Sequence, residues 1–241
     1  SDLSCHLLLL LSGFFRAGAS VPDGPALDIR FLRPPPEPVG PSSRRSGVVI
    51  SEIMYHPAKR EGVVGTQFVE IYNSLPWFED LGGWVLDGAV RYRFPSNHVI
   101  PAGGYVVIAT DPGSLRAIGL TNVLGPFENN QALPKDSGKL RLLNARGAVN
   151  FEVEYQDSDP WPVAADGGGH SLALARPSHG EHDVRAWDAS SRIGGSPGAP
   201  EPPRDAAGLS LFINEVLTRP PPGTAAFVEL FNYSEIGRAH V

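Results

Sequence analysis

The stretch VVISEIMYHPAKREGVVGTQFVEIYN, from Val48 to Asn73, is the strongest indicator of the fold. Two short apolar runs, rich in β-branched and aromatic residues, flank a loop that contains proline and glycine. This composition is typical of two β-strands joined by a loop. Each run also carries one carboxylate, Glu52 in the first and Glu70 in the second. The expected strand pair therefore places two acidic side chains in an apolar setting.

The same stretch recurs near the C-terminus as LFINEVLTRPPPGTAAFVELFN, from Leu211 to Asn232. The loop between the two runs differs in length, whereas several residues are common to both copies. In the first copy these are Glu52, Pro57, Phe68, Glu70 and Asn73, and in the second Glu215, Pro220, Phe227, Glu229 and Asn232. Copies within one chain diverge wherever nothing constrains them, so the shared residues are predicted to hold the structure of a repeated unit.

Composition favours a β protein and gives no reason to expect nucleic-acid binding. The 241 residues include 27 glycines and 24 prolines, a proportion that suits short strands joined by many turns. A hydrophobic content of 41% is sufficient for a core, and the net charge of −6 offers no attraction to a phosphate backbone. The single cysteine, Cys5, excludes an intrachain disulfide and a cysteine-based metal site.

From Gly47 onward, short strand-like runs alternate with turn signals. Even spacing of short strands with little helical periodicity indicates an all-β sandwich or barrel. Asp87-Gly88 and Asn144 to Gly147 are predicted hairpin turns, and Ser114 to Leu120 is predicted to form one helical turn or an edge element. The predicted strands cover residues 48–55, 67–73, 83–87, 90–94, 104–110, 138–144, 148–155 and 170–175.

Three further motifs accompany the repeat, namely DLGGWVLD at 80–87, IPAGGYVVI at 100–108 and GSPG at 195–198. Together with the repeat they resemble the lamin-tail domain family, of the type found in exported bacterial proteins. The resemblance implies an immunoglobulin-like β-sandwich over residues 47–201, closed by the GSPG turn, and the start of a second copy over 209–234. It also implies that Trp84 lies in the core, since family members keep an aromatic residue there.

The remaining segments are predicted to lie outside these domains. Residues 1–20 form a candidate truncated signal peptide, because Leu7 to Phe15 is apolar and Ala17-Gly18-Ala19 resembles a cleavage site. An out-of-frame end or a helix of an upstream domain would also explain this segment, which is too short to span a bilayer. Residues 21–46 and 202–208 are predicted linkers, the first Pro-rich and extended or disordered. Residues 235–241 match a translated sequencing adapter, and the chain is expected to be a fragment.

Glu52 and Glu70 admit two interpretations. Strict alternation along β-strands would place Glu52 on one face with Val48, Ile50 and Met54, and Glu70 on one face with Phe68 and Tyr72. Partly buried carboxylates in such positions are predicted to hold backbone N–H groups at a loop or a strand end. The alternative is a paired acid site for a cation or for acid–base chemistry, which would need a third ligand or a nucleophile.

Metal sites are only weakly indicated. Asp157, Asp159 and Asp166 are spaced acids in a turn-rich loop and are candidate calcium ligands, although the loop lacks the EF-hand pattern. His179 and His182, in the sequence SHGEHD, are a second candidate pair. The alternative is that both loops are solvated turns, and no cofactor is otherwise expected.

The chain carries no nucleophile elbow, phosphate-binding loop or dinucleotide fingerprint, so we predict that it is not an enzyme. The predicted function is a non-catalytic binding or scaffolding module, in tandem copies, of a larger exported or cell-surface bacterial protein. Its predicted partner is a protein or a cell-surface component, without nucleic acid or a membrane span. The alternative is an accessory domain of a secreted hydrolase or spore-coat-type kinase. A nuclear-lamina tail is disfavoured because no heptad rod or prenylation motif is present.

Overall fold

The computed structural model describes residues 6–10, 37–38, 47–58, 65–202, 211–217, 225 and 227–232. The chain divides into two compact units, one formed by Pro34–Pro202 and the other by Ser1–Arg33 together with Pro203–Val241. The larger unit extends the predicted domain of 47–201 toward the N-terminus. The predicted adapter-derived segment 235–241 lies outside the described residues.

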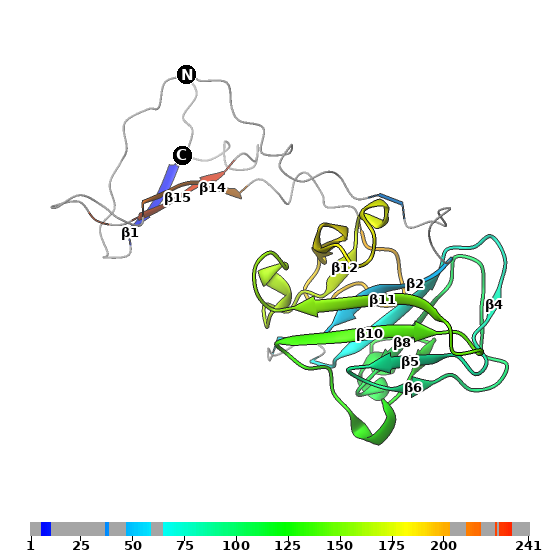
Figure 1. Cartoon of the computed structure of the whole chain (residues 1–241). Coiled ribbons are helices and arrows are strands. Elements are labelled where there is room, and N and C mark those ends of the chain that lie inside the picture. The colour runs from blue at the N-terminus through cyan, green and yellow to red at the C-terminus, as the bar shows by residue number, and fades with distance from the viewer. Residues whose placement is uncertain are drawn as a thin grey trace. The chain divides into compact units, whose positions relative to one another are not determined.

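The larger unit is a sandwich of two sheets, in which the sheet containing β10 and β11 lies across the sheet containing β2 and β8 (Figure 1). The six-stranded sheet has the order β13-β12-β2-β3-β8-β9, and the four-stranded sheet has the order β11-β10-β5-β6. The first comprises β2 (Val48–Met54), β3 (Phe68–Asn73), β8 (Tyr105–Ala109), β9 (Val123–Leu124), β12 (Leu172–Leu174) and β13 (Trp187–Ala189). The second comprises β5 (Val85–Gly88), β6 (Tyr92–Arg93), β10 (Ser137–Leu143) and β11 (Val149–Gln156). The predicted all-β sandwich is confirmed.

The eight predicted strands all appear, with ends that differ by a few residues from those expected. The additional strands are only two or three residues long, too short to show alternation in the sequence: β9, β13, β4 (Glu79–Asp80) and β7 (Val99–Ile100). The helix α1 (Pro112–Ala117) begins two residues before the predicted turn, because Asp111 caps it by accepting from the N–H groups of Gly113 and Ser114. Short 3-10 turns occupy 128–130, 163–165, 177–179 and 184–186.

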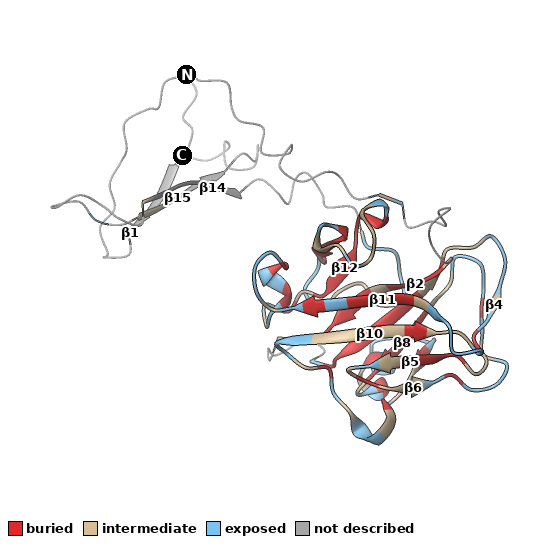
Figure 2. Cartoon of the chain, in the orientation of Figure 1, coloured by how far each residue is buried: buried red, intermediate tan, exposed pale blue. Residues whose placement is uncertain are grey.

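The main core lies between the two sheets, and Figure 2 shows mostly buried residues along β2 and β8 of the six-stranded sheet. Ile50, Ile53, Val69 and Ile71 of the six-stranded sheet belong to the same buried cluster as Leu140, Leu142 and Val153 of the four-stranded sheet. Tyr55 stacks on Tyr155 with their ring centroids 4.8 Å apart. Trp84 and Trp161 are also buried in this cluster. Burial of these large apolar side chains is the main source of stability.

A second, smaller cluster covers part of the opposite face of the six-stranded sheet. Met54, Phe68, Val107 and Ala109 pack there against Leu115 of α1 and Val123 of β9. The six-stranded sheet is therefore covered on both faces. An acidic side chain on its outer face can consequently be buried, as the next section describes.

Glu37, a described residue of the Pro-rich linker, forms hydrogen bonds with the sandwich. The N–H of Glu37 donates to the carbonyl of Ala175 at 2.6 Å, and its carboxylate accepts from Ser178 N at 2.9 Å and from Ser178 Oγ at 2.5 Å. The carboxylate of Glu37 thus satisfies the N–H and hydroxyl donors of Ser178 in the turn at 177–179, and the extended or disordered character of the linker stays a prediction.

The smaller unit contains a three-stranded sheet with the order β1-β15-β14, built from β1 (His6–Leu10), β14 (Leu211–Leu217) and β15 (Phe227–Asn232). The predicted second copy thus begins with an antiparallel strand pair, like the first. Its register pairs position 211 with 232 and position 215 with 229, and shifts between 213 and 215. The candidate signal peptide of residues 1–20 is described only at β1, so that prediction otherwise lies outside the described residues.

Candidate functional site

A β-bulge at Ser51 brings Glu52 and Glu70 together. The register of β2 against β3 shifts between Ile50 and Glu52, and Glu52 then lies directly opposite Glu70. The expected alternation along β2 is therefore wrong, because the extra residue moves Ile50 into the main core while Glu52 turns to the outer face. Both glutamates are only 2% exposed. Burial is much more complete than the partial burial predicted.

The two carboxylates hold the closing turn at residues 195–198. Glu52 Oε1 accepts from the hydroxyl of Ser171 and from Ser196 N at 3.0 Å. Glu70 Oε1 accepts from Ser51 Oγ at 2.7 Å, and Glu70 Oε2 accepts from Gly198 N at 2.6 Å. The carboxylates therefore satisfy backbone donors, as predicted, and these donors belong to a turn far away in sequence.

The electrostatics of the pair oppose ionisation. Burial raises the pKa of Glu52 to about 7, against the lowering effect of its hydrogen bonds. Burial and, second, the charge of Glu52 raise the pKa of Glu70 well above its usual range. Within the described part of the chain, no lysine, arginine or histidine forms an ion pair with either carboxylate.

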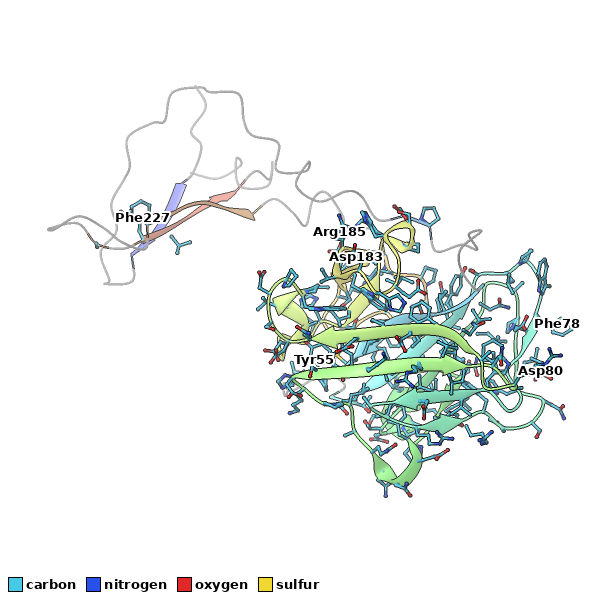
Figure 3. The ribbon with its side chains drawn as sticks, in the orientation of Figure 1. Tyr55, Phe78, Asp80, Asp183, Arg185 and Phe227 are labelled. Atoms are coloured by element: carbon cyan, nitrogen blue, oxygen red, sulfur yellow. The ribbon has the colours of Figure 1, made fainter. Side chains whose placement is uncertain are left out.

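Asn73 anchors the end of β3 and is completely buried. Its Nδ2 donates to the carbonyls of Trp77, Ile100 and Pro101 at 2.8–3.2 Å, and its Oδ1 accepts from Leu75 N at 3.1 Å. This single amide ties the chain that leaves β3 to the segment at Ile100 and Pro101. One consequence is a fixed loop from 74 to 78 that carries two exposed aromatic side chains, Trp77 (58% exposed) and Phe78 (66% exposed). Figure 3 shows Phe78 at the periphery of the unit, beside the strand that carries Asp80.

The other shared residues lie in different settings. Phe68 is buried in the outer cluster, and Pro57 is half-buried after a bridge between His56 and Asp166. In the second copy, Glu215, Glu229 and Asn232 have the same backbone register as their counterparts, while their side chains lie outside the described residues.

The candidate metal ligands do not converge. No group of three or more histidine, cysteine, aspartate or glutamate side chains suited to a metal ion is found among the described residues. Asp166 instead contacts His56, with 2.6 Å between Oδ1 and Nδ1. His179 and His182 border an open depression of about 650 Å³ together with Trp161, and Asp157 and Asp159 are not among its lining residues. Calcium binding by the three aspartates stays a prediction.

Two buried polar features escaped sequence reasoning. Gln67 donates to the carbonyls of Tyr55 and Leu133 and accepts from Leu133 N, at 2.6–2.8 Å. The repeat could not indicate this residue, because the second copy has Ala226 at the matching position. Arg176 and Asp188 form an ion pair at 2.7 Å with side chains only 5% and 8% exposed. These residues lie outside the repeated stretch, so no sequence signal drew attention to them.

A family model described as Lamin Tail Domain matches residues 41–188 of the chain. The match includes both strands of the first repeat and both sheets of the sandwich. A comparison with curated proteins returns no match. Among the described residues, no helix has the length and apolar character needed to cross a membrane.

Proposed function

This chain belongs to the lamin tail domain family, and from that premise we propose that it is a non-catalytic binding or scaffolding module of a larger exported or cell-surface bacterial protein. The observation that carries the proposal is the engagement of Glu52 and Glu70 with the closing turn. The two acids of the repeat are the best candidates for chemistry in the sequence. Both are buried and hydrogen-bonded to the protein's own backbone, so they are placed to hold the domain and not to reach a substrate.

A binding role needs a contact surface, and the loop at 74–78 offers one. Trp77 and Phe78 are adjacent, exposed and held on a fixed backbone by Asn73. Ser74 adds a second anchor, since its N–H donates to the carbonyl of Gly47 at 2.7 Å. Exposed aromatic side chains on a rigid frame lose little conformational entropy on binding and are frequent anchors of interfaces. The partner in this proposal is a cell-surface component.

A sedimentation experiment tests this function. The purified chain is incubated with intact cells and with isolated cell walls of the bacterium that carries the gene. We expect the chain to co-sediment with both, and the double variant Trp77→Ser, Phe78→Ser to bind at least about tenfold more weakly, because two anchor side chains are lost. Val163→Ser is the matched control, since Val163 is also an exposed apolar residue (70%) but lies elsewhere on the unit.

Equal sedimentation of the double variant and the control would contradict the binding surface. Hydrolysis of a glycoside, peptide or phosphoester by the purified chain, lost in Glu52→Gln or Glu70→Gln, would contradict the non-catalytic assignment. An enzymatic domain elsewhere in the complete gene would instead support an accessory role next to a secreted hydrolase or kinase.

A further inference from the structure

The hydrogen bonds of the Glu52–Glu70 pair leave one oxygen without a partner. Three of the four carboxylate oxygens accept hydrogen bonds from Ser51, Ser171, Ser196 and Gly198. The fourth, Glu52 Oε2, is buried and has no hydrogen-bond partner. A buried carboxylate oxygen without a hydrogen-bond donor is costly, and the cost is greater when the group is ionised than when it is neutral.

Among the residues that the structure describes, none with a positive charge forms an ion pair with either carboxylate. Glu201, in the segment that follows the closing turn, adds a third negative group. Tyr105 of β8 faces Glu70, and burial raises its pKa, so it is neutral. On the β12 and β13 side, Asp188 is engaged by Arg176. Two ionised carboxylates side by side in this buried site would repel each other without compensation.

We propose that the Glu52–Glu70 pair binds one proton, shared between its two carboxyl groups, and that this proton locks the closing turn onto the outer face of the six-stranded sheet. With the proton in place, the pair carries one negative charge and its three accepting oxygens hold Ser51, Ser171, Ser196 and Gly198. When the proton leaves, the two charges are relieved only by exposure to water. Exposure requires the turn at 195–198 to detach, because its backbone covers both carboxylates.

The direction of the pH response follows from the same burial. The pKa of Glu52 is about 7 in the closed form, above the value of 4.5 for an exposed glutamate. A group with a raised pKa stabilises the closed form fully below about 4.5, and this contribution is lost as the pH rises through about 7. For one proton, the opening equilibrium shifts about tenfold per pH unit within this window.

The strand register of the second copy repeats the arrangement. Positions 215 and 229 are cross-strand partners next to a register shift, as positions 52 and 70 are in the first copy. Glutamate occupies all four positions. The backbone pairing that brings Glu52 opposite Glu70 therefore recurs between positions 215 and 229.

Hydrogen exchange of the full chain between pH 5 and 8.5, corrected for intrinsic rates, tests the lock. In the wild type, protection of the Ser196 and Gly198 amides is expected to fall about tenfold per pH unit up to about pH 7. Glu52→Gln mimics the protonated acid and should retain protection with little pH dependence. Glu154→Gln removes an exposed carboxylate of β11 and should behave as the wild type.

A carbon NMR titration of the wild type, with labelled glutamate carboxyl groups, provides an independent readout that needs no variant. One carboxyl is expected to remain protonated at pH 6 and to titrate near pH 7. If every glutamate titrates below pH 5, or if the exchange protection does not change with pH, the proposal is overturned. A Glu52→Gln variant that folds but keeps the wild-type pH slope would also overturn it.

Discussion

Glu52 and Glu152 both lie within strands of the same sandwich, yet they have opposite electrostatic properties. Glu52 faces outward from the six-stranded sheet and is covered by the closing turn, and burial raises its pKa to about 7. Glu152 faces outward from the four-stranded sheet, and its hydrogen bond from Lys139, followed by the charges of Lys139 and Arg141, lowers its pKa. The difference comes from the layer above each strand. In this domain, a polar side chain on the outer face of a sheet has a structural role where another segment of the chain covers and buries it.

The largest loss of stability is expected when the side chains of Glu70 and Asn73 are removed together. Glu70→Ala with Asn73→Ala removes the part-buried hydrogen bonds from Gly198 N and Leu75 N and leaves the buried carbonyl of Ile100 without its Asn73 partner. Each unpaired buried group costs about 1–3 kcal/mol. A domain of this size loses about 2–4 °C per kcal/mol, so the thermal midpoint should fall by roughly 10 °C or more, measured by circular dichroism.

Glu152→Ala is the control for that double variant. Its ion pairs are partly exposed, and such pairs contribute about 0–1 kcal/mol, so the midpoint should move by about 2 °C or less. If the double variant melts at the wild-type temperature, Glu70 and Asn73 are not anchors. A role in ligand contact would then become the better explanation for their recurrence.

Two ion pairs, one buried and one exposed, allow the same comparison with a smaller expected effect on stability. Arg176→Ala removes the ion-pair partner of Asp188, which is buried. Arg185→Ala removes the ion-pair partner of Asp183, and here the arginine side chain is 71% exposed. Figure 3 shows Arg185 and Asp183 beside each other at the edge of the unit. Breaking a buried pair costs about 3–5 kcal/mol. Breaking an exposed pair costs much less, because water and salt screen its charges. Chemical denaturation should separate the two variants by at least about 2 kcal/mol, and equal losses would contradict the comparison.

Two neighbouring glycines allow a test of the contact between the closing turn and Glu52, with the smallest expected effect on stability. Gly194 and Gly195 both have positive φ, at 90° and 77°, so alanine strains the backbone at either position. A Cβ at Gly194 would meet nothing within 4 Å, whereas a Cβ at Gly195 would lie 2.1 Å from Glu52 Oε1. Gly195→Ala should therefore lower the midpoint by several degrees more than Gly194→Ala, because only the former displaces the turn from the carboxylates. Identical thermal midpoints of the two variants would contradict a close contact between the turn at Gly195 and the Glu52 carboxylate.

The strands of the sandwich could be predicted because most are short runs with several apolar residues between turn signals. The anchoring role of Glu70 and Asn73 could be predicted because the repeat preserves them while loop lengths change. Gln67 could not, since its three partners lie at Tyr55 and Leu133 and its counterpart in the second copy is alanine. The bulge at Ser51 could not be predicted either. One inserted residue reverses which face of the sheet the following side chains point to, and the composition of the strand does not reveal it.

From the amino-acid sequence alone, a β-sandwich could be predicted for residues 47–201, because alternating apolar runs and turn residues act locally. The sequence also determined that two glutamates and an asparagine recur at matching places in its repeated stretch. Only the tertiary structure decided what those side chains touch. Glu52 and Glu70 meet each other through a bulge, and they meet Ser196 and Gly198 across more than a hundred residues of chain. The burial that sets their protonation arises from segments distant in sequence, so no local pattern could encode it.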